Sequence, residues 1–285
     1  MSEPLRPAPD QARATAATTI DARHLHGVSE TALLTLHQRA SEAARPDGLI
    51  RDPMAIALRG QIGYDYQNFG RTHQATAWRA LVFDRATREY LDAHPRATVV
   101  ALAEGLQTSF WRLDNGRLNW LSVDFEPIIQ LREQLLPKSA RLKTCAQSAL
   151  DYSWMDHVDG EHGVLITAEG LFQYLEHAVV IDLITACAKR FRGAQLVFDS
   201  VPKFLSAHSR QRGFKLSDNY TAPPMPFWFT ATQYDELRTI DGVWDVRELP
   251  GPPGRGAFLR WFTPLAYRMP LLARFRAATT VIEFR

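Results

Sequence analysis

A glycine and an acid, placed about twenty residues apart, carry the clearest chemical signal in the sequence. Gly105 follows a β-branched, apolar run that begins at Thr98 and is typical of a buried strand. A second apolar run, from Leu118 to Val123, ends in Asp124. Strand, glycine turn, helix, strand and acid form a mononucleotide-binding layout, in which the acid meets a ribose hydroxyl about 20 residues after the glycine.

The glycine turn itself restricts which nucleotide can bind. Gly105 is the only glycine between Ala103 and Gln107, so few backbone N–H groups can surround a pyrophosphate. A nucleoside ligand without phosphates suits this turn better, and S-adenosylmethionine (SAM) is such a ligand. A nicotinamide-dependent dehydrogenase is the alternative on a similar sheet, and the missing glycines speak against it.

Longer segments of the chain resemble a known family. The sequence resembles the leucine carboxyl methyltransferase family, closest to the bacterial branch that includes polyketide O-methyltransferases. The resemblance covers roughly residues 28 to 200, in the family's order. It rests on the segments ETALLTLHQRASEAARPDGLIRDPMA, RALVFDRATREYL, VVALAEGLQTSFWRLDNGRLNWLSVDFEPIIQLREQLLP, SALDYSWMD and AEGLFQYL.

The resemblance implies an α/β, Rossmann-like class I methyltransferase fold, with a mostly parallel seven-stranded sheet and helices on both faces. The sequence pattern agrees, because apolar strand-like runs alternate with helical segments from Thr98 onward. Strands are expected near 98–103, 118–123, 141–145, 163–168, 194–199, 243–249 and 279–284. Helices are expected at 126–136, 177–191 and 231–239.

The expected organisation is a disordered tail (1–20) followed by a single methyltransferase domain (21–285). Its first part, 21–95, is predicted to be a helical cap, with Ser29 as the N-cap of a helix running to about Ala44 and another helix over 73–93. The part from 201 to 240 is predicted to be a lid insertion, since residues 201–230 combine four prolines with six aromatic residues. An edge packing segment is the alternative for that stretch.

The resemblance also implies a set of cofactor-binding residues. A guanidinium grips the methionine carboxylate of SAM, a turn passes under the methionine and ribose, and acids bind the ribose and the methionine end. Surface arginines and helix-capping acids are the alternative interpretations of these side chains. The expected residues are Arg39, Arg79, Ala103, Glu104, Gly105, Asp124, Phe125, Ser148, Ala149 and Glu169.

Four positions depart from the family's usual pattern, which has glycine at 103, a small residue at 104, an acid at 107 and aspartate at 148. Alanine fits position 103 if the backbone there is extended. Glu104 either pairs with the SAM ammonium or a nearby arginine, or it obstructs the pocket. Asp151 could substitute for Ser148 at the adenine. A SAM-binding module without turnover is therefore a further alternative.

The expected reaction is methyl transfer to an oxygen of a small molecule, a hydroxyl or a carboxylate of a polyketide-type metabolite. Alignment of the reactants supplies most of the acceleration in such an in-line displacement. Tyr174, Tyr220 and Trp228 are expected to line the acceptor pocket. A base is needed only for a hydroxyl acceptor, and nothing in the sequence selects among His73, His208 and Tyr220.

Composition limits the partners. The 33 basic and 31 acidic side chains give a net charge of +2, which argues against a protein that binds nucleic acid by neutralising phosphates. No apolar run approaches the ~20 residues of a membrane span, and the N-terminus does not resemble a signal peptide. Cys145 and Cys187 lack metal-ligand spacing and are predicted to be reduced core residues. We expect a cytoplasmic protein without metal, nucleic-acid or membrane partners, of undetermined oligomeric state.

Overall fold

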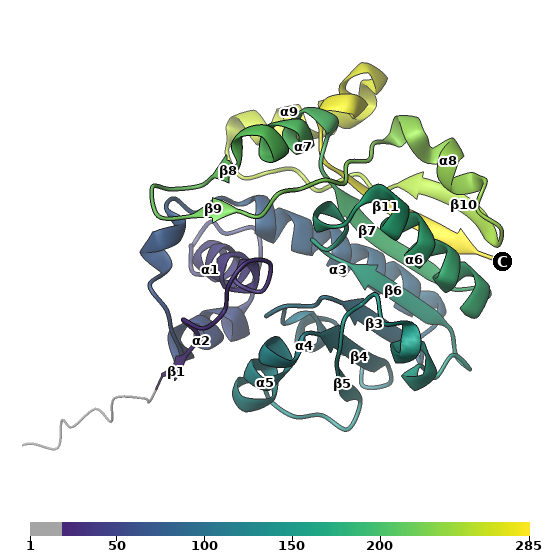
Figure 1. Ribbon diagram of the computed structural model, residues 1–285, viewed down its shortest axis with the longest axis horizontal. Coiled ribbons are helices and arrows are strands. Elements are labelled where there is room, and N and C mark those ends of the chain that lie inside the picture. The colour runs from purple at the N-terminus through teal and green to yellow at the C-terminus, as the bar shows by residue number, and fades with distance from the viewer. Residues whose placement is uncertain (1–18) are drawn as a thin grey trace, which may run out of the picture.

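The computed structural model describes residues 19–285, and a seven-stranded sheet forms its centre (Figure 1). The strands lie in the order β10-β11-β7-β6-β3-β4-β5, and only β10 and β11 break the parallel arrangement, each pairing antiparallel with its neighbour. The predicted fold class is confirmed. The strands are β3 (Thr98–Leu102), β4 (Asn119–Asp124), β5 (Leu142–Ala146), β6 (Val164–Ala168), β7 (Gln195–Ser200), β10 (Val243–Glu248) and β11 (Ala278–Phe284).

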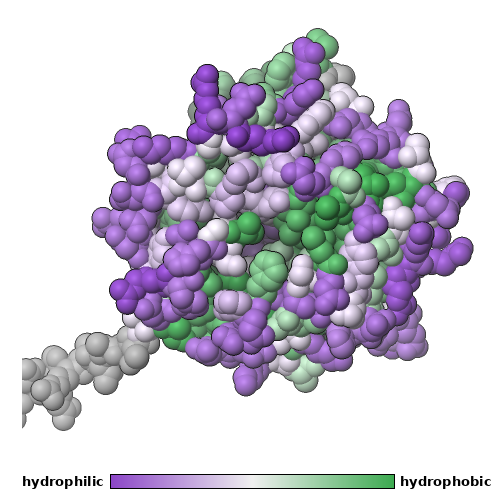
Figure 2. All heavy atoms as spheres, viewed as in Figure 1, coloured by the Kyte–Doolittle hydropathy of each residue, from purple (hydrophilic) through white to green (hydrophobic). Residues whose placement is uncertain are grey.

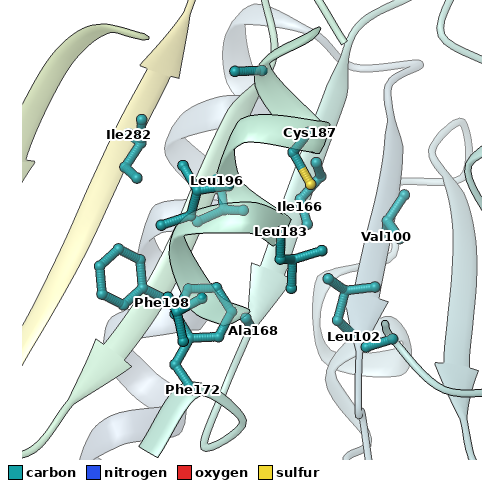
Figure 3. Close-up of a cluster of buried hydrophobic side chains, with 14 of the residues drawn as sticks. Val100, Leu102, Ile166, Ala168, Phe172, Leu183, Cys187, Leu196, Phe198 and Ile282 are labelled. Atoms are coloured by element: carbon teal, nitrogen blue, oxygen red, sulfur yellow. The ribbon is translucent and has the colours of Figure 1, made fainter. Parts of the chain in front are cut away.

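Helices cover both faces of the sheet, which is why the central strands are apolar throughout. All five residues of β3 and of β6 are buried. On one face, α6 (His177–Arg190) packs Leu183 and Cys187 against the strands; Figure 3 shows these side chains beside Ile166 and Leu196. On the other face lies α3 (Ala75–Ala93) with the short α4 (Ser109–Leu113). Both cysteines are buried and free, as predicted.

The predicted N-terminal helical cap contains α1 (Thr31–Ala43), α2 (Pro53–Gln61), a 3-10 turn (Tyr66–Phe69) and α3. The prediction that Ser29 caps α1 is wrong, because the residue before the helix is Glu30, which is helical and makes no side-chain cap bond. Asp52 does cap α2, accepting from the Ala55 N–H at 2.9 Å. The predicted tail falls almost entirely outside the described residues; Ile20–Asp21 form β1, paired with β2 (Ile62–Gly63).

The aromatic triplet at the end of the predicted lid belongs to the core. Phe227 and Phe229 stack on each other and meet Phe198 of β7 edge-on, and both are buried. Trp228, between them, points away from the core, and the centroid of its ring lies 4.9 Å from the Lys203 Nζ. Alternation in an extended segment puts every second side chain on the same side, so two of the three aromatics fill the core. The rest of 201–240 contains α7 (Lys203–Arg212), the β8–β9 hairpin (Phe214–Lys215, Thr221–Ala222) and α8 (Tyr234–Arg238).

The chain between β10 and β11 forms a further unit at the edge of the molecule. It contains α9 (Ala257–Arg268) and a 3-10 turn, η5 (Pro270–Phe275), which lie together at the top of Figure 1. The sequence analysis placed no helix between the strands expected at 243–249 and 279–284. Among residues 19–285, none of the helices combines the length and apolar character needed to cross a membrane.

Candidate active site

A cavity of about 210 Å³ lies where β3, β4 and β6 end, enclosed by the loops that follow these strands and by the start of α1. Figure 2 shows hydrophobic side chains around a hollow near the middle of the displayed face. Most of the predicted site residues line this cavity: Arg79, Ala103, Glu104, Gly105, Asp124, Phe125, Ser148, Ala149, Glu169 and Tyr174. Arg39, Tyr220 and Trp228 do not.

The turn after β3 has two residues with left-handed backbone. Gly105 has a φ of +60°, which glycine adopts without strain, and Ala103 has a φ of +49°. The expectation that an extended backbone accommodates Ala103 is therefore wrong. A Cβ in this region meets the following carbonyl oxygen at a cost of roughly 1–2 kcal/mol. The family's usual glycine would fit here without that cost.

Ala103→Gly is expected to stabilise the protein by about 0.5–1 kcal/mol, because relief of the left-handed strain exceeds the extra chain entropy that glycine loses on folding. Urea unfolding of the purified protein measures this difference. As a control, Ala80→Gly inside α3 removes the same methyl group from a helical position and should destabilise. A loss of stability in both variants would contradict the strain at position 103.

Asp124 joins the end of β4 to the turn after β3. Its Oδ2 accepts from the Gly105 N–H at 2.6 Å, and its Oδ1 accepts from the Phe125 N–H at 2.7 Å. Burial raises the pKa of Asp124 to about 6, although both N–H groups and Arg132 oppose that shift. The carboxylate thus holds the turn in place and ionises close to neutral pH.

Glu104 is paired with an arginine, one of the two outcomes expected for it. Arg132 of α5 (Glu126–Leu135) lies 2.9 Å from the Glu104 carboxylate, and both side chains are buried. Arg132 Nη1 also donates to the carbonyl oxygens of Gly105 and Gln107. This arginine was missed from the sequence, although its position four residues after the buried Ile128 places it on the inward face of its helix.

The contact between Gln107 and Glu169 accounts for the amide at position 107. Its Nε2 donates to Glu169 Oε1 at 2.7 Å, at a position where the family usually has an acid. An acid here would face the Glu169 carboxylate directly, and an amide avoids that repulsion. The chain therefore carries its extra carboxylate at Glu104, where Arg132 neutralises it, and a neutral amide at position 107.

Arg79 of α3 lies between two carboxylates at the ends of neighbouring strands. Its Nε donates to Glu169 at 3.0 Å, and its Nη1 donates to Asp199 at 3.3 Å. Burial opposes the positive charge, but Asp199 and Glu169 outweigh burial and raise the pKa of Arg79. Asp199 also accepts from the Gly170 N–H at 2.5 Å, and a Cβ at Gly170 would lie 2.9 Å from the Arg79 Nη2. The sequence analysis missed Asp199, although it stands near the end of a predicted strand.

Arg39 was predicted to bind the cofactor, but it does not line the cavity. Its side chain is 0% exposed and binds Asp52 at 3.0 Å and the Leu106 carbonyl oxygen at 2.7 Å. Asp52 also binds Arg112 of α4, and Arg112 binds Asp84 of α3. The buried carboxylate draws Arg39 away from the cavity and into a network that ties the N-terminal helices to the turn after β3.

At the far end of the cavity the side chains are small or apolar. Ser148 and Ala149 line it together with Phe125 and Leu150, two large apolar side chains that are exposed. The Ser148 hydroxyl accepts from the Leu150 N–H at 3.2 Å. The suggestion that Asp151 substitutes for Ser148 is wrong, because Asp151 is turned away to cap the following 3-10 turn and does not line the cavity.

Another part of the wall includes Tyr174 with Thr31 and Thr35 of α1. The prediction that Tyr220 and Trp228 also line the acceptor side is wrong. Tyr220 packs edge-on against Phe69, 4.8 Å between ring centroids, within the helical cap. His73 and His208, considered as bases, are exposed and lie outside the cavity wall. The part of the chain that the structure describes contains no cluster of side chains suited to a metal.

An acid at the end of β4 and a cavity over the carboxyl ends of the parallel strands suit a nucleoside ligand, and the family model that the chain matches makes it a SAM-dependent methyltransferase. Within that class the chain belongs to the leucine carboxyl methyltransferase family, which residues 32–188 match. The resemblance noted in the sequence is confirmed, and SAM is the methyl donor that the family uses.

Relatives and solved structures agree with this assignment. The chain is 32% identical over 184 residues to the tetracenomycin polyketide synthesis O-methyltransferase TcmP of Streptomyces glaucescens, covering 62% of this chain and 67% of that one. It is 29% identical over 188 residues to the SAM-dependent methyltransferase dpfgK of Gibberella zeae, covering 59% and 63%. A putative methyltransferase structure from Thermobifida fusca has a TM-score of 0.53 at 14% identity, covering 87% and 94%, and supports the fold alone.

Proposed function

We propose that this methyltransferase acts on an oxygen atom of a small-molecule acceptor, and that this oxygen is already an anion when it binds. The observation that carries the proposal is the composition of the cavity wall. No histidine lines it among the described residues, and its carboxylates are engaged by protein groups. The similarity to TcmP, a polyketide O-methyltransferase, supports an oxygen acceptor of the polyketide type.

The residues present fit SAM. Phe125 and Leu150 expose apolar surface at one end of the cavity, which the face of a planar aromatic ring such as adenine would cover. Asp124 would accept from the ribose hydroxyls, beside the Gly105 turn. Arg79, with Nε and Nη1 engaged, would use Nη2 for the methionine carboxylate, and Glu169 would face the ammonium. When bound, SAM supplies an electrophilic methyl group on a sulfonium.

SAM affinity is expected to fall about tenfold between neutral pH and pH 5, because Asp124 must be ionised to accept from ribose. Its pKa of about 6 means that falling pH protonates the carboxyl and removes that acceptor, while rising pH restores it. Isothermal titration calorimetry across this range measures the effect.

The matched control for this pH dependence is Asp124→Asn. The amide does not titrate, so the variant should bind SAM weakly at every pH and show a flat profile. Burial also raises the pKa of Glu169, with Arg79 opposing the shift, so Glu169 is the rival source of the pH dependence. An Asp124→Asn variant that keeps the full decline would assign the titration to Glu169 and refute the role of Asp124.

The acceptor side of the cavity can orient an oxygen but has little means to deprotonate one. Burial raises the pKa of Tyr174, so its hydroxyl is a hydrogen-bond donor at neutral pH and a poor base. Thr31 and Thr35 of α1 donate their hydroxyl protons to the carbonyl oxygens of Val28 and Ala32, so neither adds a free donor or a base. Such a wall suits an oxygen that arrives charged, which is the case for a carboxylate or for an acidic phenol of a polyketide.

Methyl transfer to a series of phenols with graded acidity tests this proposal, together with matched carboxylic acids and aliphatic alcohols. The rate should rise with pH through each phenol's own pKa, and neutral alcohols should not react. Mass spectrometry of the products identifies the methylated atom. A pH profile shared by all acceptors would indicate a base on the enzyme, and methylation at nitrogen alone would refute an oxygen acceptor.

A further inference from the structure

Helix α9 turns its apolar side toward solvent. Phe258, Trp261, Phe262 and Leu265 recur at i, i+3, i+4 and i+7, the spacing that normally marks the buried stripe of a helix. Here all four are exposed, Phe258 by 72% and Trp261 by 79%. A helix with this pattern has an unpartnered face within a single copy of the chain.

The turn that follows the helix adds three more exposed apolar side chains. We call the whole set the α9 face; its members are Phe258, Trp261, Phe262, Leu265, Met269, Leu271 and Phe275. Taking about 200 Å² for each large side chain, their exposed fractions leave roughly 800 Å² of apolar surface. The largest apolar patch on a monomer is usually about 300–600 Å², whereas one side of a stable protein–protein interface is about 800 Å².

The charged side chains of this segment are all arginines, and Arg268, three residues after Leu265, lies beside the apolar stripe of α9. The sequence from 249 to 282 contains arginines but no acid, and Arg260, Arg268 and Arg274 are exposed. Arg260 lies two residues from both Phe258 and Phe262, which places it on the opposite side of α9 from the apolar stripe. An anionic membrane in contact with the stripe would therefore not reach Arg260. Interface cores are apolar and aromatic with few acids, which describes the α9 face.

We propose that the α9 face binds the same face of a second copy of this chain. In such a two-fold contact the stripe of one α9 packs on the stripe of the other, and each copy supplies the area that a stable dimer needs. Because the charged side chains of this segment are all basic, those of the two copies repel each other. Because salt screens that repulsion, the dimer should tighten as salt is added.

The segment also has a defined place relative to the active site. β10 is antiparallel to β11, and β11 is antiparallel to β7, so β10 runs in the same direction as β7. The α9 unit thus leaves and rejoins the sheet at the edge where the cavity lies.

Sedimentation equilibrium of the full chain tests the proposal, with a dimer of the 32.3 kDa protein as the expected species. Trp261→Glu and Phe258→Glu should each weaken dimerisation by at least about 30-fold, the effect of losing a central interface residue. Trp244→Glu is the matched control, because Trp244 is 66% exposed on β10 away from α9 and should leave the dimer intact. Circular dichroism and SAM affinity should be unchanged in all three variants.

Added salt and lipid vesicles distinguish a second copy of the chain from a membrane as the partner of the α9 face. Dimerisation that strengthens with added salt supports the proposal, and dimerisation that weakens with salt contradicts it. Co-sedimentation with vesicles of phosphatidylglycerol and phosphatidylcholine tests a membrane surface directly. A wild-type protein that stays monomeric at all concentrations overturns the proposal. So does a monomer whose vesicle binding depends on Trp261, or a dimer that Trp261→Glu leaves unchanged.

Discussion

Asp52→Ala is expected to lower the free energy of unfolding by about 3–5 kcal/mol, the cost of removing one partner from a buried ion pair. Asp52 Oδ2 binds Arg39 at 3.0 Å, Arg112 at 2.7 Å and the Thr108 hydroxyl at 2.6 Å. Without the carboxylate, the fully buried Arg39 keeps a positive charge with only a carbonyl oxygen to bind. Arg112 loses less, because it retains Asp84. Urea unfolding measures the difference.

The same variant should weaken SAM binding, although Asp52 lies outside the cavity wall. Arg39, which Asp52 positions, donates to the Leu106 carbonyl in the turn that forms the cavity floor. A displaced Arg39 releases that turn. Asp52→Asn preserves the shape and the bond to Thr108 and should fall between alanine and wild type in both measurements.

Asp47→Ala provides the control for this network. Asp47 forms an ion pair of similar length with Arg45, 2.9 Å, but both side chains are exposed. Exposed pairs contribute about 0–1 kcal/mol, so this variant should unfold close to wild type. Equal, small effects at Asp47 and Asp52 would mean that the buried network contributes little to holding the helical cap on the sheet.

The centre of the sheet could be predicted from the sequence because its strands are short, mostly apolar runs bounded by turn residues. β3 and β6 are buried on both faces, so they needed no alternation to be recognised. The Gly105–Asp124 unit was predictable for a related reason: its chemistry lies in backbone conformation and spacing, which the sequence records directly. Both are local properties of the chain.

The choice between two arginines was not predictable. Arg39 and Arg79 are each on a helix of the cap, and either could reach a carboxylate ligand. Which one faces the cavity depends on a partner distant in sequence: Asp52 holds Arg39 in the interior, while Glu169 and Asp199 hold Arg79 at the cavity wall. Helix propensity and spacing carry no information on such pairs.

The prediction of a lid over 201–240 rested on composition, which does not say what covers the apolar residues. Phe227-Trp228-Phe229 looked too apolar for an exposed loop, which is correct, but a lid is only one way to cover such residues. The extended backbone sends Phe227 and Phe229 inward onto β7 and Trp228 outward. The unpartnered aromatic face lies instead on α9, where Phe258, Trp261, Phe262 and Leu265 follow helical spacing.

Phe227→Ala is expected to destabilise the protein by about 3–5 kcal/mol, as truncation of a buried phenylalanine leaves a cavity that the surroundings fill only in part. Phe227 is 1% exposed, stacks on Phe229 with 6.0 Å between centroids, and meets Phe172 and Phe198 edge-on. The site is enclosed by the sheet and α6, so little can move into the vacated space. Chemical unfolding of the variant gives the loss directly.

Trp228→Ala, the adjacent substitution, separates the core role from a lid role. It removes a larger side chain, but this side chain is partly exposed and contacts Lys203 by a cation–π interaction of about 0.5–1 kcal/mol. The loss of stability should therefore stay near 1 kcal/mol. SAM affinity should be unchanged in both variants wherever they are folded, since neither side chain lines the cavity. If Phe227→Ala left the stability unchanged but abolished methyl transfer, the segment would act as a lid rather than as part of the core.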